Sequence, residues 1–186
     1  MTKAPNERED DPRIEPETPF LLDGAMPRAM PLPAELQAEV VIASDTRAVL
    51  DDRLEAYENI FDSEIGDTNL TRARNIERET GLRQLYLKFD GGNPTGTQKD
   101  RIAFAQALDA LRRGFDTMTA ATCGNYGAAV SLAASYAGLR CLIFIPSNYH
   151  PTRVDEMKAN GAEIVRNSGD YEAAVDASRE RAEKHE

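Results

Sequence analysis

The 186-residue sequence contains few of the residues that build zinc sites or disulfide frameworks, with only two cysteines and two histidines. Cys123 and Cys141 do not form a CxxC motif, and no pair of histidines lies near either of them in the sequence. Structural zinc sites require such spacings, and disulfide scaffolds are built from more cysteines in shorter chains. The composition therefore predicts neither a metal site nor a disulfide framework.

Positive charge and long apolar runs are also scarce. The sequence has 22 basic and 32 acidic residues, for a net charge of -10, whereas nucleic-acid binding relies on basic contacts to phosphates. No apolar run approaches the roughly 18 residues that a membrane span needs. The first 19 residues contain no apolar stretch of the kind found in secretory signals. We therefore expect a cytoplasmic protein that binds neither nucleic acid nor a membrane.

Proline is concentrated at one end, because seven of the ten prolines lie within the first 33 residues, mixed with aspartate and glutamate. Proline removes a backbone donor and fixes φ, so this composition predicts an acidic, proline-rich arm over residues 1–34. Residues 35–60 follow it, and their apolar spacing predicts a mostly helical segment from about residue 45 onward.

Strands and helices are predicted to alternate over the rest of the chain, with short connections between them. The predicted strands are 84–89, 117–122, 140–146 and 162–167, and the predicted helices are 99–113, 126–138, 152–160 and 171–186. This alternation is typical of an α/β fold, a parallel sheet with helices on both faces. We expect Ile102, Ala105, Leu108 and Leu111 to form the buried face of the first of these helices.

The segment GGNPTGTQKDR, residues 91–101, leads into that helix and places Lys99 at its start. It is not a P-loop, because Thr97 and Gln98 separate Gly96 from the lysine. The positive end of a helix dipole disfavours a protonated amine, which favours the neutral nucleophile that imine formation requires. Two interpretations remain open: an ordinary lysine in the first turn, which this pattern alone favours, or an amine held for covalent chemistry.

The segment TAATCGNYGAA, residues 119–129, connects a predicted strand directly to a helix. Backbone N–H groups and a hydroxyl at a helix start can bind a carboxylate or phosphate. The alternative is ordinary N-capping by Thr122 or Asn125, with glycines that allow close packing, and on this segment alone it is the favoured interpretation. Cys123 has no histidine near it in the sequence, so we interpret it as a small buried thiol.

Four stretches, taken together and in order, are far more specific than either segment alone. They are IGDTNL (65–70), LYLKFDGGNPTGTQKDR (85–101), ATCGNYGAAVSLAASYAGLRCLIFIP (121–146) and MKANGAEIVRNSGDYEAA (157–174). With these motifs, residues 65–186 resemble the N-terminal half of pyridoxal-phosphate enzymes of the tryptophan-synthase-β fold type, fold type II. The resemblance is strongest to the threonine synthases.

This resemblance implies a role for each matching residue. Lys99 corresponds to the lysine that links covalently to pyridoxal 5'-phosphate, and Asn125 to the asparagine that hydrogen-bonds the 3′ oxygen of the pyridoxal ring. The loop that grips the substrate carboxylate corresponds to Thr122, Cys123, Gly124, Asn125 and Tyr126. For each segment, the functional one of its two interpretations agrees with these roles: a deprotonated amine at Lys99 and an anion-binding helix start at residues 122–126.

The resemblance also implies an activity: a pyridoxal-phosphate-dependent lyase that converts O-phosphohomoserine to threonine and phosphate, and that forms a homodimer when full length. Cysteine synthase, or threonine or diaminopropionate ammonia-lyase, is the alternative within the same chemistry. A non-enzymatic alternative is a truncated paralogue that binds an amino acid or a partner subunit.

The implied domain organisation assigns residues 35–98 to the large cofactor domain and 99–186 to a smaller αβα lobe that carries the asparagine loop. The last predicted helix would cross over to another strand, so we expect the domain to be incomplete at its C-terminus. The family's glycine-rich phosphate-binding loop belongs to the second half of the fold. The 186-residue chain alone is therefore expected to bind the cofactor weakly and to be inactive.

Overall fold

A parallel sheet of three strands forms the centre of the described part of the chain. The computed structural model describes residues 33–122, 124–149 and 152–184. The strands are β3 (Thr117–Ala121), β4 (Arg140–Pro146) and β5 (Glu163–Asn167), in the spatial order β3-β4-β5. Thr119 pairs with Leu142, and Phe144 pairs with Val165. Each predicted strand of this sheet is confirmed within one residue at either end.

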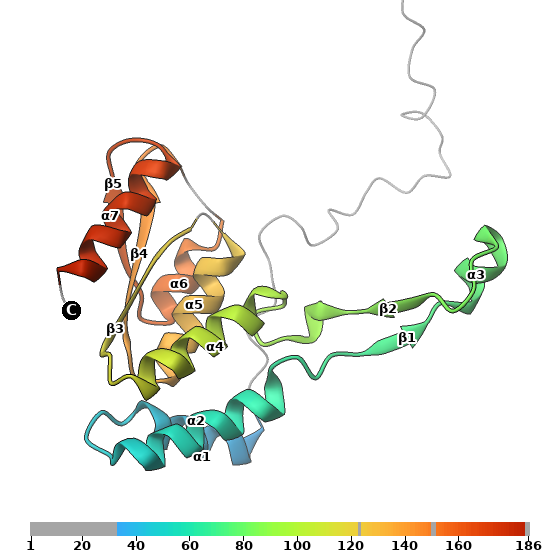
Figure 1. Cartoon of the computed structure of the whole chain (residues 1–186), viewed down its shortest axis with the longest axis horizontal. Helices are drawn as coiled ribbons and strands as arrows, with labels where there is room; N and C mark the ends of the chain where they lie inside the picture. Colours follow the sequence, from blue (N-terminus) through green and yellow to red (C-terminus); the bar gives the residue numbers. More distant parts are fainter. Residues whose placement is uncertain (1–32, 123, 150–151, 185–186) are drawn as a thin grey trace, which may run out of the picture.

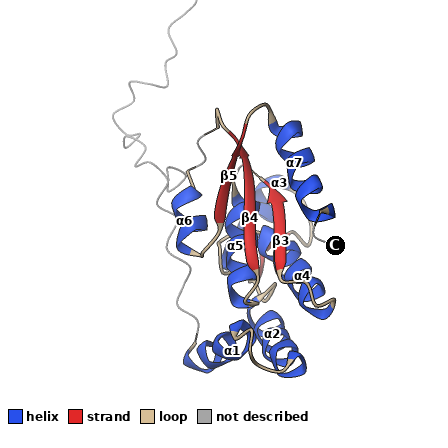
Figure 2. Cartoon of the chain, turned by 90° about the vertical axis from the view of Figure 1, so that its left-hand side faces the viewer, coloured by secondary structure: helices blue, strands red, loops and turns tan. Residues whose placement is uncertain are grey.

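Helices cover both faces of the sheet (Figure 2). The helices α4 (Lys99–Arg112), α5 (Asn125–Tyr136) and α6 (Val154–Ala159) lie on one face, and α7 (Tyr171–Glu183) lies on the other. The predicted α/β architecture, a parallel sheet with helices on both faces, is confirmed. Among the described residues, no helix is long and apolar enough to cross a membrane.

The apolar run of β4 supplies the centre of the core, because a strand covered on both faces carries apolar residues on both. Cys141, Ile143 and Ile145 belong to a large hydrophobic cluster that also contains residues of α2 (Leu50–Glu64), α4 and α5. Leu142 and Phe144 alternate with them and pack with Ala174 of α7. The strand side chains therefore divide between the two faces with the period of two that a strand imposes.

The buried face of α4 is the predicted one only in its second half, where Leu108 and Leu111 are buried as expected. Ala103, Phe104, Ala107, Leu108 and Leu111 are buried, whereas Ile102 is 49% exposed and Ala105 is also exposed. The predicted stripe took every third residue, but an α-helix has 3.6 residues per turn. A strict spacing of three therefore drifts around the helix, while the buried set follows one continuous side.

Two helices precede the sheet and pack against α4 and α5 (Figure 1). They are α1 (Ala34–Ser44) and α2 (Leu50–Glu64), so helix begins earlier than the predicted residue 45. In α2, the hydroxyl of the fully buried Tyr57 donates to the carbonyl oxygen of Ala133 at 3.2 Å. The predicted arm over residues 1–34 lies almost entirely outside the described residues.

A hairpin-like arm extends away from this body (Figure 1). It consists of β1 (Leu70–Arg72), α3 (Arg74–Thr80) and β2 (Tyr86–Lys88), and β1 pairs with β2 in antiparallel register. The strand predicted at 84–89 is thus shorter than expected and lies outside the parallel sheet. Gly81 ends α3 with φ of 74°, a conformation that suits glycine.

Candidate functional site

The loop before Lys99 is anchored by buried polar side chains. Asn93, Thr95 and Thr97 are each at most 7% exposed. The Oδ1 atom of Asn93 accepts a hydrogen bond from the backbone N–H of Gly66 at 3.0 Å, and its Nδ2 donates to the carbonyl oxygen of Asp90 at 2.8 Å. The loop is therefore fixed to two neighbouring segments, the 66 region and the 90 region, before the helix begins.

Lys99 and Asp100 start α4 in opposite environments. Asp100 is fully buried and accepts hydrogen bonds from the backbone N–H and the hydroxyl of Thr95 at 2.8 and 2.5 Å. Burial raises the pKa of the Asp100 carboxyl, while the Thr95 bonds and the charge of Arg153 act in the opposite direction. Lys99 is exposed, and its amine has no hydrogen bond or ion pair with the described part of the chain. The Lys99 amine therefore has no polar partner among the described residues, although the loop before it and the residue after it are anchored by hydrogen bonds.

The asparagine loop follows β3, as predicted, and leads into α5 at Asn125. Thr122 is 5% exposed, and its hydroxyl oxygen accepts a hydrogen bond from the N–H of Gly124 at 3.4 Å. Gly124 is the N-cap residue of α5, and the helix has no side-chain cap, so the alternative of capping by Thr122 or Asn125 is wrong. Cys123 lies outside the described residues.

Two other residues of this region serve packing. A Cβ atom on Gly127 would lie 2.5 Å from Cε of Met157 and 2.8 Å from Cγ2 of Thr122, so a larger residue there would force these side chains to shift. The hydroxyl of Tyr126 forms a hydrogen bond with Oε1 of Gln106 on α4 at 2.5 Å. Burial raises the pKa of Tyr126. Its ring is therefore held against α4. Of this residue, only the backbone is then left for the predicted contact with the substrate carboxylate.

The residue that joins the two loops was not identified from the sequence. Arg153 donates from Nη2 to the carbonyl oxygen of Thr95 at 2.9 Å and from Nη1 to Oδ1 of Asn125 at 3.1 Å. It also forms a two-point ion pair with Glu156, with both distances 2.7 Å. The loop that precedes Lys99, residues 91–98 (the lysine loop), and the asparagine loop therefore both bond to the guanidinium of Arg153. Only the spacing of Arg153 and Glu156 is visible in the sequence, and such pairs are common on exposed helices.

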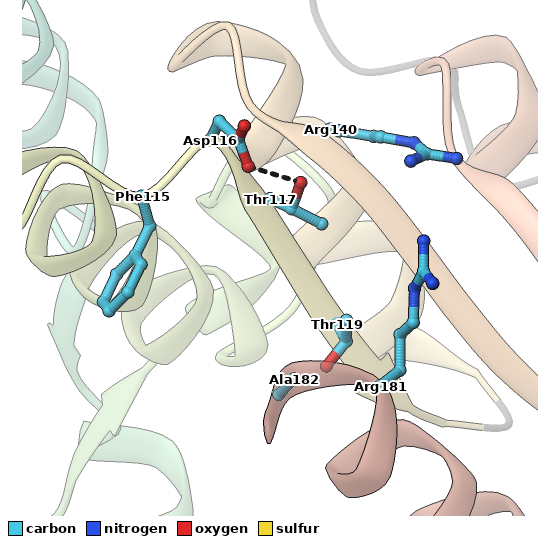
Figure 3. Close-up of a pocket in the computed structure, with 7 residues that line it drawn as sticks. All are labelled: Phe115, Asp116, Thr117, Thr119, Arg140, Arg181 and Ala182. Carbon is cyan, nitrogen blue, oxygen red and sulfur yellow. Dashed lines mark hydrogen bonds between the residues drawn. The ribbon is translucent and has the colours of Figure 1, made fainter. Parts of the chain in front are cut away.

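The cavity of Figure 3 lies elsewhere, along the outer edge of β3. Its volume is about 390 Å³, and its lining residues are Phe115, Asp116, Thr117, Thr119, Arg140, Arg181 and Ala182. It reaches the start of β3, whereas the asparagine loop follows the end of that strand. Ligands of α/β proteins bind outside the carboxyl ends of the strands. None of the predicted site residues lines this cavity, which we therefore separate from the candidate site.

Comparison with known proteins identifies the family. Residues 61–186 match the family model described as "Pyridoxal-phosphate dependent enzyme". The chain belongs to this family. It is 33% identical to cystathionine beta-synthase of Mus musculus over 171 residues, which cover 89% of this chain and 28% of that protein. It is also 33% identical to threonine synthase of Halalkalibacterium halodurans over 120 residues, 64% of this chain and 34% of that protein.

A solved structure agrees with these relatives. The crystal structure of cysteine synthase from Entamoeba histolytica matches with a TM-score of 0.59 and 26% identity, over 69% of this chain and 40% of that one. The chain spans about a third of the length of the two curated relatives above. The predicted fold type and the predicted cofactor, pyridoxal 5'-phosphate, are confirmed. The relatives include a cystathionine beta-synthase, a threonine synthase and a cysteine synthase. Membership of the pyridoxal-phosphate-dependent family is therefore confirmed, whereas the specific prediction of a threonine synthase is not.

The described residues fit this cofactor. A pyridoxal aldehyde requires an amine without a competing partner, and Lys99 has none among the described residues. The ring oxygen requires a hydrogen-bond donor, and Asn125 uses its oxygen on Arg153, which leaves its NH₂ group for that purpose. The roles of Lys99 and Asn125 remain predictions, as do those of Thr122, Cys123, Gly124 and Tyr126.

Proposed function

We propose that this chain supplies the lysine and the asparagine loop of a pyridoxal-phosphate-dependent active site that performs elimination and replacement on an amino-acid substrate. The observation that carries the proposal is the Lys99 amine, which has no polar partner in the described part of the chain and which follows directly on a loop fixed by buried side chains. When bound, pyridoxal phosphate supplies an electron sink for the carbon atoms next to the substrate amine.

The chain's own residues then have separate tasks. The Lys99 amine would hold the cofactor covalently, and the same amine would carry a proton to or from the substrate carbons. Asp100, although adjacent, is engaged with Thr95 and so does not pair with that amine. The first backbone N–H groups of α5, which have no side-chain cap, bind the substrate carboxylate.

For the substrate, we propose O-phosphohomoserine, with threonine and phosphate as products, as the motifs around Lys99 and Asn125 favour. The second candidate is replacement on a serine whose hydroxyl carries a leaving group, as in cysteine synthase. The structural match to a cysteine synthase, which extends over 69% of the chain, supports this second candidate. Purified full-length protein assayed for phosphate release and for sulfide consumption distinguishes the two. We also propose that the protein is a cytoplasmic homodimer. Light scattering measures the mass of the assembly and so tests the dimer.

The lysine assignment has a direct test. Full-length protein is incubated with pyridoxal phosphate, reduced with borohydride and digested, and the modified lysine is located by mass spectrometry. We expect the adduct on Lys99, its loss in Lys99→Ala, and its retention in Lys158→Ala, which removes another exposed lysine. Lys88 is a second internal control, because its amine is already bonded to the carbonyl oxygens of Gly66 and Thr68. An adduct that persists at full yield in Lys99→Ala would refute the assignment.

The same experiment tests the non-enzymatic alternative. A truncated paralogue that only binds an amino acid or a partner subunit has no need of a reactive lysine. Wild-type full-length protein without any lysine adduct, but with calorimetric binding of an amino acid, would favour that alternative over the proposed enzyme.

A further inference from the structure

Arg153 is an unusual residue for its position, the N-cap of the short helix α6. It is only 8% exposed, and arginine is seldom buried unless it is fully paired. Its guanidinium carries five N–H donors, and four of them donate hydrogen bonds to three partner residues. One edge faces Glu156 of its own helix, and the other donors reach Thr95 and Asn125. The side chain therefore connects α6 to both loops of the candidate site.

The contact with Asn125 determines which end of that amide is free. Arginine has no acceptor, so the atom of Asn125 that faces Nη1 at 3.1 Å must be the oxygen. The NH₂ group is then directed away from Arg153, and it has no hydrogen-bond partner in residues 33–122, 124–149 and 152–184. An exposed asparagine side chain can otherwise rotate by half a turn and exchange its donor for its acceptor. Arg153 removes this freedom.

The contact with Thr95 places the lysine loop in the same frame. The carbonyl oxygen of Thr95 accepts from Arg153, while its N–H and hydroxyl donate to Asp100. Thr95 is thus held from both sides, four residues before Lys99. A shift of Arg153 would move the lysine loop relative to the asparagine loop, because no other described side chain bonds to both Thr95 and Asn125.

We propose that Arg153 is a positioning residue: it presents the NH₂ group of Asn125 toward the cofactor ring and fixes the spacing of that group from Lys99. The proposal rests on the function proposed above. Arg153 touches neither cofactor nor reacting atoms in this scheme, and it acts through Asn125 and Thr95. A purely structural role, in which Arg153 only fastens α6, is the competing explanation.

The first test needs no cofactor. In full-length apo protein labelled with ¹⁵N, the side-chain amide signals of Asn125 should shift and broaden in Arg153→Met and Arg153→Lys, because the amide is released. The signals of Asn160, whose Nδ2 donates to Ser131, serve as the internal reference and should stay in place. Arg140→Met is the matched control, since Arg140 also forms a two-point pair with a glutamate but contacts neither loop. Unchanged Asn125 signals in both Arg153 variants would overturn the proposal.

The second test uses bound cofactor. We expect Arg153→Met to weaken pyridoxal-phosphate binding about tenfold, the factor that loss of one charge-assisted hydrogen bond corresponds to. The pH dependence of the cofactor's absorbance should change as it does in Asn125→Ala. The double variant, Arg153→Met with Asn125→Ala, should bind pyridoxal phosphate no more weakly than Asn125→Ala alone, because Arg153 acts through the Asn125 side chain. A fastening role predicts additive losses and an unchanged absorbance profile, and that outcome would also overturn the proposal.

The proposed function and the proposed role of Arg153 can be refuted separately. Wild-type protein without a lysine adduct would refute the proposed function, while the Asn125 amide signals would still report whether Arg153 orients that side chain. A normal adduct at Lys99 together with additive losses would refute only the role of Arg153. Arg153→Lys, which keeps the charge, provides the measurement if Arg153→Met fails to fold.

Discussion

Replacement of Asn93 by alanine tests whether the lysine loop owes its rigidity to buried hydrogen bonds. The side chain is 4% exposed and makes two bonds to backbone groups, from Gly66 at 3.0 Å and to Asp90 at 2.8 Å. Each bond contributes about 1 kcal/mol net, and a backbone group left buried without a partner costs about 1–3 kcal/mol. Gly66 is only partly buried, so water replaces part of its loss.

We therefore expect Asn93→Ala to lower the free energy of unfolding by about 2–3 kcal/mol, a large share of the about 5–15 kcal/mol typical of folded domains. Urea denaturation measures this change, and an unchanged slope would indicate that the folded state keeps its compactness. Hydrogen exchange should accelerate at the Gly66 amide. Asn75→Ala, at an exposed position of α3, is the control and should stay within about 0.5 kcal/mol of wild type. Equal stabilities of the two variants would refute the reasoning.

Two further predictions concern buried ionisable groups. Burial raises the pKa of the Cys141 thiol to about 12, and the residue is 3% exposed. In a Cys123→Ser variant at pH 8, we therefore expect no reaction with a thiol reagent until denaturant is added. Stoichiometric labelling of the folded protein would contradict this. Burial also raises the pKa of Asp100, so folding takes up a proton between the unfolded and the raised folded value. Its contribution therefore makes stability fall as pH increases through that window, and Asp100→Asn should flatten this part of the pH profile in thermal melts; an identical profile would contradict the shift.

The sequence predicted those parts of the fold that depend on local pattern. The apolar run of β4 and the glycine-rich connections are sufficient to predict a parallel α/β arrangement, and the loop before Lys99 correctly predicted the start of α4. For the buried face of α4, Leu108 and Leu111 were predicted correctly, whereas Ile102 and Ala105 were wrong because a spacing of three was followed instead of the helical 3.6. The antiparallel pairing of β1 with β2 was also missed, since such pairing depends on contacts between segments rather than on either strand alone.

The candidate site was predictable only in part. Lys99 and Asn125 were found because a family motif surrounds each of them. Arg153 has no such motif, and its importance follows from burial and from partners 28 and 58 residues away in the sequence. Contacts of this range are a property of the folded chain, so pattern and spacing do not reveal them.

The burial of Arg153 also bears on the ionic strength at which the site keeps its geometry. Dissolved salt screens ion pairs between exposed side chains, such as Arg47 with Asp45, where the arginine side chain is 88% exposed. The Arg153 side chain is 8% exposed, so counterions have little access to its bonds with Thr95 and Asn125. Concentrated salt should therefore weaken the exposed ion pairs of this chain well before it weakens the bonds that join the two loops of the site.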